Sequence, residues 1–485
     1  MKHMPPAEAM VQARQKRGFS PAILVGLCRV GEYISLILLG FLAHAWHVAP
    51  QYSLQATYVF ALLVMPLAYL VVAQSAGAYR LEALRKPLKT GLRVTLAWSG
   101  IVLGAMALAF SLRLEGSLSR LWLGLWFGGG LIGLLAGRAV AALATGALTR
   151  AGRLDRYTVI VGGGPLAEML LTELSRQACP DLRILGLFDD REDDRSPDLI
   201  AGYPKLGTID DLIGFARHTR VDQVIFALPI TAEGRILAML RKLWVLPVDI
   251  RLAAHANRLR FRPRSYSYIG AVPVFDVLDK PMSDWAVLGK AVFDRIVGAF
   301  ILVAAAPLML ATALGVKLTS RGPVLFKQER YGFNNERIVV YKFRSLFIDQ
   351  ADPLAHKLVG RDDPRVTPFG RFIRKSSLDE LPQLFNVVFK GDLSLVGPRP
   401  HALEAKAADW TYEQAVDGYF ARHRVKPGVT GWAQVNGWRG ETDTVEKIQR
   451  RVECDLEYIE NWSLALDIYI LAATPFALFR GDSAY

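Results

Sequence analysis

Apolar residues follow two distinct patterns along this chain. Near the N-terminus they form four long stretches, at roughly residues 21–46, 54–77, 92–112 and 119–147. As a helix, each stretch is long enough to cross about 30 Å of hydrocarbon. From Arg156 onward the apolar runs are short and alternate with amphipathic segments, which is typical of strands and helices in turn. The pattern predicts a bundle of four transmembrane helices at residues 21–150, after a polar segment at residues 1–20, and an α/β region beyond it.

Basic residues between the apolar stretches predict the orientation of the helices. The connection between the second and third stretches is rich in them: Arg80, Arg85, Lys86, Lys89 and Arg93. The first connection, residues 44–53, has no lysine or arginine, whereas Arg150, Arg153 and Arg156 follow the fourth stretch. Because basic loops stay on the cytoplasmic side, both ends of the bundle are expected in the cytoplasm. The alternative is that the four stretches form the buried helical core of a soluble protein.

Two charged residues, Arg29 and Glu32, interrupt the first apolar stretch. Charged side chains are costly in lipid. The two residues lie three positions apart, so on a helix they would share a face and could form an ion pair. The other interpretation is that the first membrane span begins later in the chain.

Four short apolar runs predict a Rossmann-like parallel sheet at residues 151–257. They lie at residues 157–161, 184–188, 221–228 and 245–252. The first run leads into the sequence GGGPLA at residues 162–167, and Asp189 follows the second run. Glycines after a strand, with an acidic residue about twenty positions on, are the pattern that holds a dinucleotide or nucleotide sugar. Gly162, Gly164 and Asp189 are therefore candidate nucleotide ligands, with Asp189 at the ribose. The alternative is a glycine-rich turn that only packs a helix onto a strand.

Composition and charge narrow the range of partners. Hydrophobic residues make up 52% of the 485 positions, the mean hydropathy is +0.23 and the formal net charge is +13. A basic chain of this hydrophobicity favours anionic lipid or phosphate ligands. No run of Lys and Arg is interleaved with aromatic residues, so nothing indicates a nucleic-acid partner. The three cysteines show no metal or disulfide spacing, which fits a reducing cytoplasm.

The most informative stretch is residues 376–400, SSLDELPQLFNVVFKGDLSLVGPRP. In it Asp379 and Glu380 precede Pro382, a residue suited to the first turn of a helix. Carboxylates at a helix N-terminus lie beside free backbone N–H groups, which keep them ionised and also attract phosphate. Arg399 stands between two prolines in a stiff loop and can donate paired hydrogen bonds to phosphate. Taken alone, the Asp-Glu pair would indicate no more than a capped surface helix.

Further motifs surround this stretch. Lys342-Phe343-Arg344-Ser345 and Asp363-Pro364-Arg365-Val366-Thr367 precede it, and the sequence KPGVTGWAQVNG follows it at residues 426–437. Together these motifs closely resemble the bacterial sugar transferases that act on polyprenyl phosphate, the polyprenyl-phosphate hexose-1-phosphate transferases. The resemblance covers the C-terminal part best. The N-terminal layout is similar to the longer members, of the undecaprenyl-phosphate glucose phosphotransferase type.

The resemblance implies a catalytic domain at residues 285–485. Such a domain transfers hexose 1-phosphate from a UDP-sugar to undecaprenyl phosphate and releases UMP, the initiating step of exopolysaccharide, capsule or O-antigen synthesis. Mg²⁺ is the expected cofactor, because phosphoryl transfer between two anions requires charge neutralisation. Our hypothesis is covalent catalysis, in which Asp379 attacks the sugar-linked phosphorus and Glu380 holds the Mg²⁺. The residues expected to bind substrate or phosphate are Lys342, Arg344, Arg365, Arg374, Arg399 and Gln434.

A linker rich in Tyr, Arg and Pro is expected at residues 258–284, followed by an apolar helix at about residues 290–318. A single membrane crossing there would place the catalytic domain outside the cell, away from cytoplasmic UDP-sugar. Pro307 removes one helix hydrogen bond and can bend the helix back. We therefore expect a re-entrant helix, as the resemblance also implies, with Ala306 where family members often carry serine. The alternative is a fifth span.

The expected protein is a multi-pass protein of the bacterial inner membrane. It combines a four-helix transmembrane bundle, a Rossmann-like domain and a monotopic α/β catalytic domain on the cytoplasmic side. Its C-terminal helix, residues 464–479, is expected on the membrane surface, or else packed over the catalytic core. The resemblance also suggests a homodimer.

Several functions compete with the expected transfer of glucose 1-phosphate. Galactose 1-phosphate is the alternative group for the same reaction. A non-catalytic scaffold of polysaccharide assembly and a membrane-anchored nucleotide-sugar dehydratase belong to other classes. The dehydratase requires a tyrosine with a lysine four positions on, and this chain has none.

Overall fold

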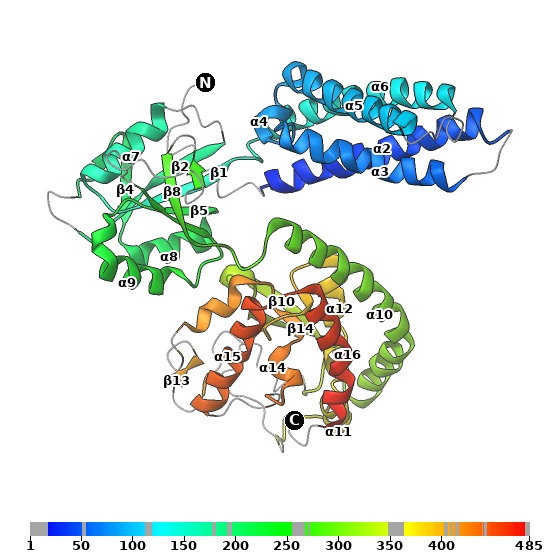
Figure 1. The fold of residues 1–485 in the computed structure, drawn as a ribbon. Helices are drawn as coiled ribbons and strands as arrows, with labels where there is room; N and C mark the ends of the chain where they lie inside the picture. Colours follow the sequence, from blue (N-terminus) through cyan, green and yellow to red (C-terminus); the bar gives the residue numbers. More distant parts are fainter. Residues whose placement is uncertain are drawn as a thin grey trace. The chain divides into compact units, whose positions relative to one another are not determined.

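The computed structural model describes residues 18–50, 55–111, 119–176, 181–191, 196–254, 267–269, 272–347, 363–401, 406–407, 410–412, 416, 418–438, 440 and 444–480. The chain divides into two compact units, one at Gln15–Asp155 and one that contains Arg156–Tyr485. Figure 1 shows their elements.

The N-terminal unit is helical. Its helices are α2 (Pro21–His47), α3 (Ala56–Ser75), the short α4 (Leu81–Leu84), α5 (Pro87–Ser111) and α6 (Arg120–Arg150). They share one core in which Trp98, Trp122 and Trp126 are fully buried. Many outward-facing side chains are also apolar, for example Phe60 and Leu143, which suits helices surrounded by lipid. The prediction of several apolar helices near the N-terminus is therefore confirmed.

A buried ion pair lies inside this unit. Glu32 of α2 pairs with Arg138 of α6 at 2.6 Å, and both side chains are buried. Tyr69 and Tyr79 donate hydrogen bonds to the same carboxylate at 3.0 and 2.5 Å. Glu32 thus takes its partner from another helix rather than from Arg29 three positions away, which lies over the Tyr79 ring. The expected local pair was wrong, because a distant guanidinium and two hydroxyls satisfy the buried carboxylate more completely.

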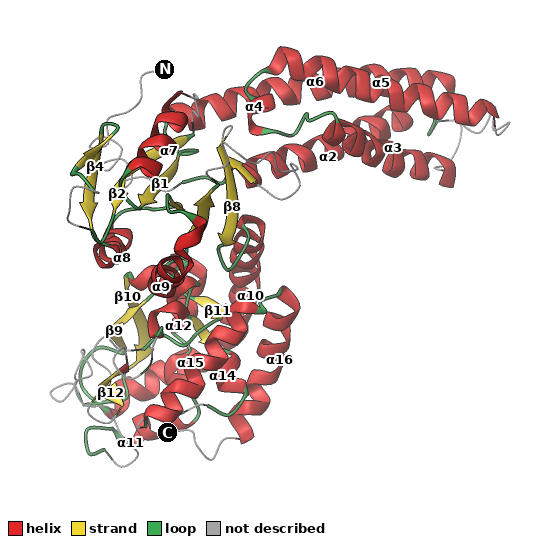
Figure 2. Ribbon diagram, turned by 60° about the vertical axis from the view of Figure 1, so that its left-hand side comes forward, coloured by secondary structure: helices red, strands yellow, loops and turns green. Residues whose placement is uncertain are grey.

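An α/β sheet opens the second unit. The predicted strands form as β1 (Arg156–Val161), β2 (Leu182–Phe188), β5 (Gln223–Phe226) and β6 (Asp249–Ala253), and they pair in parallel. The whole sheet has the order β3-β4-β2-β1-β5-β6-β8-β7. Helix α7 (Pro165–Arg176) covers one face, and α8 (Ile209–His218) and α9 (Glu233–Leu243) cover the other (Figure 2).

The sheet is larger than the sequence indicated. Strands β3 (Leu199–Ile200) and β4 (Tyr203–Gly207) extend one edge, and β8 (Val272–Leu278) and β7 (Ser267–Ile269) extend the other. Strand β8 pairs antiparallel with β6. Residues 267–269 and 272–278, expected to be part of a linker, therefore belong to the sheet. Pro273 and the arginine-rich sequence before these strands hid the strand pattern, since proline is uncommon inside a strand.

The C-terminal part of the second unit begins with the 36-residue helix α10 (Asp284–Thr319), which continues through Pro307 and follows an arc in Figure 1. Its other helices are α11 (Pro368–Lys375), α12 (Gln383–Phe385), α14 (Trp432–Val435), α15 (Val445–Glu460) and α16 (Leu464–Arg480). The antiparallel pair β9 (Leu325–Tyr331) and β10 (Arg337–Phe343) and the parallel pair β11 (Ser394–Val396) and β14 (Gly428–Thr430) lie among them. A small pair, β12 (Lys406–Ala407) and β13 (Trp410–Thr411), completes the strands of the described residues.

Buried charges hold α10 onto this part. Lys290 Nζ lies 2.6 Å from Asp467 Oδ2 of α16, and Tyr458 of α15 donates to Asp467 Oδ1 at 2.7 Å. One turn after Lys290, Asp294 accepts a hydrogen bond from Ser394 Oγ of β11 at 2.7 Å. The first half of α10 is thereby fixed against the strands that carry the candidate site.

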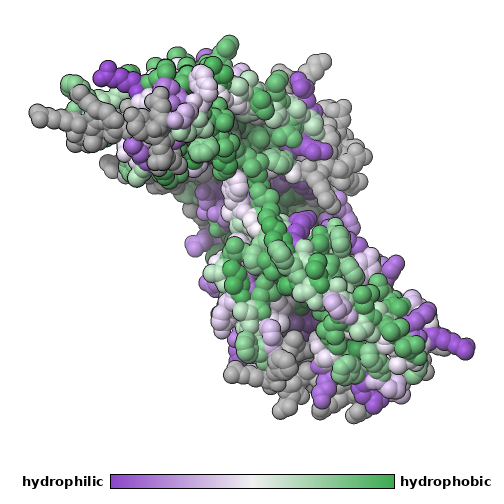
Figure 3. Space-filling model, turned by 90° about the vertical axis from the view of Figure 1, so that its right-hand side faces the viewer, coloured by the Kyte–Doolittle hydropathy of each residue, from purple (hydrophilic) through white to green (hydrophobic). Residues whose placement is uncertain are grey.

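Large apolar side chains cover the outer face of α10, and α11 and α16 expose others. The exposed ones include Ile296, Phe300, Val303, Leu310, Leu314, Leu318, Phe372, Ile468 and Phe476. Figure 3 shows hydrophobic residues gathered on this side of the C-terminal part. Five helices of the described chain, α2, α3, α5, α6 and α10, are long and apolar enough to cross a membrane. Exposed apolar surface of this extent marks the protein as membrane-associated.

Candidate active site

The two carboxylates lie in a short turn. Leu378–Glu380 forms one turn of 3₁₀ helix, entered through Ser377, whose φ of 56° is left-handed. The chain then continues as one α turn, Gln383–Phe385, and one π turn, Asn386–Lys390. The predicted regular helix after Pro382 is thus only partly correct.

Asn386 accounts for the irregular helix. Its fully buried amide donates to Val339 O at 2.7 Å and accepts from Tyr341 N at 3.1 Å, both on β10. It also donates to Asp392 Oδ1 at 3.2 Å. These bonds tie the segment to the strand that carries Lys342, so the carboxylates and that lysine are held at a constant separation.

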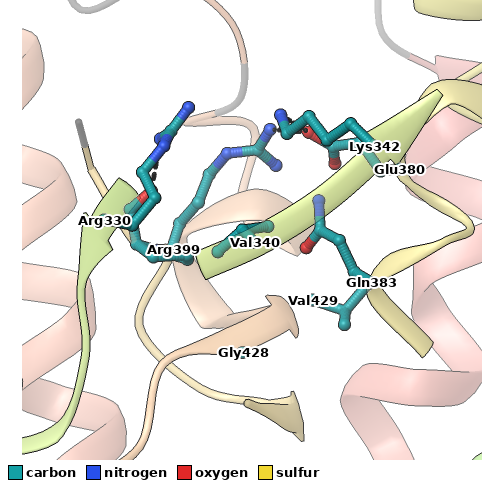
Figure 4. Close-up of a pocket in the computed structure, with 9 residues that line it drawn as sticks. Arg330, Val340, Lys342, Glu380, Gln383, Arg399, Gly428 and Val429 are labelled. Carbon is teal, nitrogen blue, oxygen red and sulfur yellow. Dashed lines mark hydrogen bonds and ion pairs between the residues drawn. The ribbon is translucent and has the colours of Figure 1, made fainter. Parts of the chain in front are cut away.

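Glu380 is the centre of the charged group. Its Oε1 accepts from Lys342 Nζ at 2.8 Å and from Arg399 Nη2 at 2.5 Å. The lysine comes from β10 and the arginine from the loop after β11, so three separate segments converge here. Figure 4 shows the Lys342 and Arg399 side chains directed toward Glu380. The structure therefore brings together four of the predicted residues, Asp379, Glu380, Lys342 and Arg399.

A small pocket contains Glu380, Lys342 and Arg399. It is lined by Arg330, Val340, Lys342, Glu380, Gln383, Arg399, Pro400, Gly428 and Val429. Its floor depends on close backbone packing, since a Cβ on Gly428 would lie 2.1 Å from the Gly397 nitrogen. The glycines of the two C-terminal motifs thus let the Arg399 loop approach β14.

The two adjacent carboxylates differ in acidity. Burial, reinforced by the neighbouring Glu380 charge, raises the pKa of Asp379 to about 6. For Glu380 burial acts in the same direction, but Arg399 and Lys342 outweigh it and hold the pKa of that carboxyl well below its usual range. Near neutral pH Asp379 is therefore a weakly compensated anion of raised basicity, whereas Glu380 is a firmly ionised partner of two cations.

Arg330 was not among the predicted site residues. It lies on β9, lines the pocket and donates to Pro400 O at 2.6 Å. In the sequence it is one of several basic residues in an unremarkable run, about fifty positions before the carboxylates. The pairing of β9 with β10 sets Arg330 opposite Ile338, on the pair of strands that also carries Lys342.

A second buried arginine supports the Arg399 loop from behind. Arg422 Nη2 lies 2.7 Å from Arg399 O and 2.6 Å from Asp455 Oδ2 of α15. Its Nη1 lies 2.5 Å from His401 Nδ1. Burial and the Arg422 charge hold the pKa of His401 well below its usual range, so a neutral ring receives this hydrogen bond. The loop is thereby locked in place at consecutive residues.

Two predicted phosphate ligands point elsewhere. Arg344 is buried and donates to Arg321 O and Ser320 O at the C-terminal end of α10, both at 2.8 Å. It follows the end of β10, so the strand alternation that would place it beside Lys342 no longer applies. Arg365 pairs with Asp363, its Nη2 lying 2.7 Å from Oδ2. Neither lines the pocket.

Of the remaining two predicted phosphate ligands, Arg374 lies near the group, and no described contact joins Gln434 to it. Arg374, in the last turn of α11, is close enough to lower the pKa of Asp379. Gln434 lies on α14, and its buried Oε1 has no hydrogen-bond partner among the described residues. It does not line the pocket, so its contact with substrate stays a prediction.

The carboxylates suit Mg²⁺ only together with substrate. The described residues contain no cluster of three or more His, Cys, Asp or Glu that could hold a metal. Mg²⁺ is commonly held by one or two carboxylates with substrate phosphates and water, and Asp379 and Glu380 supply that number. Lys342 and Arg399 both bind the Oε1 atom of Glu380, and the described contacts leave its Oε2 atom for such a role.

In the α/β sheet, Asp189 faces the glycine-rich loop itself. Its Oδ2 accepts from Gly163 N at 2.6 Å, and Arg191 pairs with the same oxygen at 2.7 Å. Gly162 and Gly164 have φ of 107° and 92°, which only glycine adopts readily. The geometry therefore shows a loop closed by its own acidic residue, and nucleotide binding by these residues stays a prediction.

Two family models and several known proteins match this chain. Residues 285–481 match the family model described as "Bacterial sugar transferase", and residues 74–254 match one described as "CoA-binding domain". A protein of Escherichia coli K12 called "UDP-glucose:undecaprenyl-phosphate glucose-1-phosphate transferase" is 32% identical over 97% of this chain and 99% of its own length. A protein of that name from Xanthomonas campestris pv. campestris is 37% identical, over 76% of this chain and 75% of its own. An "Undecaprenyl-phosphate glucose phosphotransferase" of Komagataeibacter xylinus is 41% identical, over 68% and 60%.

Proposed function

Because this chain belongs to the bacterial sugar transferase family, we propose that it transfers glucose 1-phosphate from UDP-glucose to undecaprenyl phosphate. The products are undecaprenyl diphosphate glucose and UMP, and the reaction initiates synthesis of an exopolysaccharide. The observation that carries the proposal is the group of Glu380, Lys342 and Arg399 in one pocket, with Asp379 next in the chain and within reach of their charges. The names of the relatives reported above indicate the choice of glucose as the sugar and undecaprenyl phosphate as the lipid.

In the proposed mechanism Asp379 is the nucleophile. A carboxylate oxygen of Asp379 attacks the phosphorus that bears the sugar, the bond from that phosphorus to the bridging oxygen breaks, and UMP leaves with the electron pair. A phosphate oxygen of the lipid then attacks the same phosphorus, the bond to Asp379 breaks, and the carboxylate is restored. The bond between sugar and phosphate stays intact throughout. The raised pKa of Asp379 supports this role, because a more basic carboxylate is a better nucleophile and is still mostly ionised at pH 7.

The cations position and neutralise the phosphates. Arg399 presents a planar pair of donors at the pocket, held by the backbone bonds to its loop. Lys342 adds a point charge on the side of Glu380. When substrate phosphate enters, it competes with Glu380 for these donors, so the carboxylate is released at the moment when the anion is bound. This exchange aligns the reacting phosphorus with Asp379.

We also propose Mg²⁺ as the cofactor, held by Glu380, by Asp379 or by both together with substrate phosphates. When bound it would neutralise phosphate charge. The residues of the chain would orient it through the unshared oxygen of Glu380. Loss of UMP release in EDTA, restored by added Mg²⁺ but not by Na⁺, would support this; full activity in EDTA would exclude it.

The proposed setting is the inner membrane, with four spans and a re-entrant α10. Basic residues lie near both ends of α10, Lys290 and Lys317 among them, and its outer face is apolar. Cysteines introduced at Gly289 and Ser320 in a chain without native cysteines should both react with a membrane-impermeant maleimide in inverted vesicles and not in intact spheroplasts. Labelling of only one of them in each preparation would mean that α10 is a fifth span. The homodimer stays a prediction, which mass measurement of nanodisc particles would test.

UMP release tests the proposed function. The full chain in nanodiscs is mixed with undecaprenyl phosphate and Mg²⁺, and with either UDP-glucose or UDP-galactose. Release that depends on the lipid and on UDP-glucose supports the proposal, and release from UDP-galactose alone would move it to the alternative sugar. No release from either donor by a folded protein would support the scaffold interpretation.

A further inference from the structure

Arg330 differs from the other cations of the pocket in how its charge is compensated. Lys342 and Arg399 share the carboxylate of Glu380. Arg330 has no carboxylate within ion-pair distance in the part of the chain that the structure describes. Its guanidinium donates three hydrogen bonds to neutral acceptors: Nη1 to Pro400 O at 2.6 Å, and Nη2 and Nε to Gln328 Oε1 at 2.6 and 3.1 Å.

The surroundings of Arg330 make a positive charge without a carboxylate partner unfavourable for the stability of the fold. Arg330 is partly buried, Gln328 is buried, and the charge of Arg399 is near enough to disfavour a second guanidinium. A buried charge without a partner destabilises a fold unless something else compensates it. Burial and the Arg399 charge lower the pKa of Arg330 to about 10, the Glu380 charge offsets them only in part, and Arg330 stays charged at neutral pH.

A purely structural role would not need this charge. The carbonyl of Pro400 requires one N–H donor, which a neutral amide could supply. The comparable arginine behind the same loop, Arg422, binds the Arg399 carbonyl and is neutralised directly by Asp455. At position 328, by contrast, a neutral amide stands where a carboxylate would complete an ion pair. Figure 4 shows Arg330 and Arg399 extending toward the same end of the pocket.

We propose that Arg330 is a substrate-binding residue that, together with Arg399, binds one phosphate group in the pocket. The inference rests on the proposed function, since the anion is a phosphate oxyanion of a reactant. Two sources share this chemistry, the diphosphate of the UDP-sugar and the phosphate of the lipid. Gln328 holds the guanidinium in position and leaves its charge available to the ligand.

The substitution Gln328→Glu is the most specific test of phosphate binding by Arg330. The new carboxylate has nearly the shape of the amide and keeps both acceptor contacts, but it neutralises Arg330. If Arg330 binds phosphate, Gln328→Glu and Arg330→Gln should each raise one KM by roughly 10- to 100-fold, the range for a charge-assisted hydrogen bond, and Arg330→Lys should raise it less. If Arg330 only anchors the loop, Gln328→Glu should leave both KM values unchanged, because it strengthens the anchor.

The assay is the initial rate of UMP release by the full chain in nanodiscs, with UDP-glucose and undecaprenyl phosphate varied in turn. Arg337→Gln, at an exposed arginine on the neighbouring strand β10, is the matched control and should leave both KM values unchanged. A raised KM for the nucleotide sugar assigns Arg330 to the donor, and a raised KM for the lipid assigns it to the acceptor. Either result supports the inference.

Two outcomes would overturn it, and they are distinguishable. An active wild type whose Gln328→Glu and Arg330→Lys variants fold and keep both KM values would overturn the inference and leave the proposed function standing. A folded wild type that releases no UMP would overturn both. Because Gln328→Glu preserves the buried contacts of Arg330, the test does not depend on whether the Arg330 variants fold.

Discussion

The acidity of Asp379 leads to a quantitative prediction for the first half of the reaction. Only the ionised carboxylate can attack phosphorus, so UMP release should fall as the pH falls through the pKa of Asp379. That pKa is raised to about 6, first by burial and then by the Glu380 charge. The ionised fraction is then about 0.9 at pH 7, 0.5 at pH 6 and 0.1 at pH 5, so the rate should fall by about tenfold between pH 7 and pH 5.

Loss of folding is not expected over this range. The folded-state pKa of Asp379 is raised, so this group contributes stability that is present below its unfolded value and is lost as the pH rises through about 6. The pKa of Glu380 is depressed, so its contribution is present above the unfolded value and is lost only as the pH falls well below 4.5. Acidification to pH 5 should therefore inhibit the enzyme reversibly.

The assay must distinguish the titration of Asp379 from the titration of the lipid phosphate. A phosphate monoester such as undecaprenyl phosphate has its second pKa near 6 and would give a similar profile. A single-turnover measurement with UDP-glucose and no lipid removes this ambiguity, because only the first step takes place. The initial rate of the UMP burst is recorded from pH 5 to pH 8, and a sample returned from pH 5 to pH 7 serves as the control.

Two results would refute this reasoning. A burst rate that is constant from pH 5 to pH 7.5 would mean that Asp379 is not the titrating nucleophile. An activity that does not return at pH 7 would mean that acid damages the fold. A shift of the acid limb to higher pH in Arg374→Gln would add support, since Arg374 lowers the pKa of Asp379.

The other predictions concern the partner carboxylate, the anchor of α10 and the N-terminal region. Glu380→Gln should lower the rate by at least about 100-fold without unfolding the protein, because it removes the proposed metal ligand and leaves two cations unpaired; wild-type-like turnover would exclude its role. Lys290→Met should destabilise the C-terminal part by about 3–5 kcal/mol in a thermal or chemical unfolding assay, since it leaves Asp467 buried without its cation, and adding Asp467→Leu should recover much of the loss. No recovery in the double variant would argue against that pair. A chain of residues 281–485 should keep some lipid-dependent UMP release, because the pocket and its supports lie within it; a folded, membrane-bound but inactive chain would show that the earlier regions are required.

Local apolar patterns in the sequence predicted most of the helices and strands. The apolar stretches predicted α2, α3, α5, α6 and α10, and the short runs predicted four parallel strands. They missed β7 and β8, because Pro273 and the arginine-rich sequence before these strands resemble a linker. They also mispaired Glu32, since its partner Arg138 lies 106 positions away, and spacing along one helix carries no information about another helix.

The residues of the candidate site could be predicted where they lie in a distinctive sequence motif. Asp379, Glu380, Lys342 and Arg399 stood in distinctive motifs; the structure places the last three in one pocket and Asp379 within reach of their charges. Arg344 was expected beside Lys342, but β10 ends at Phe343, so the alternation of side chains along the strand does not extend to it. The role of Arg330 depends on a strand pairing and on the neutral residue at position 328, neither of which is visible from spacing alone.

The most direct test of the central claim is the mass of the intact protein after incubation with UDP-glucose and Mg²⁺ in the absence of lipid. We predict an added hexose phosphate on wild-type protein, located on the peptide that contains Asp379, absent from Asp379→Asn and removed when undecaprenyl phosphate is added. An unmodified wild-type protein that nevertheless forms undecaprenyl diphosphate glucose when both substrates are present would contradict the covalent mechanism. It would point to direct transfer within a complex of both substrates.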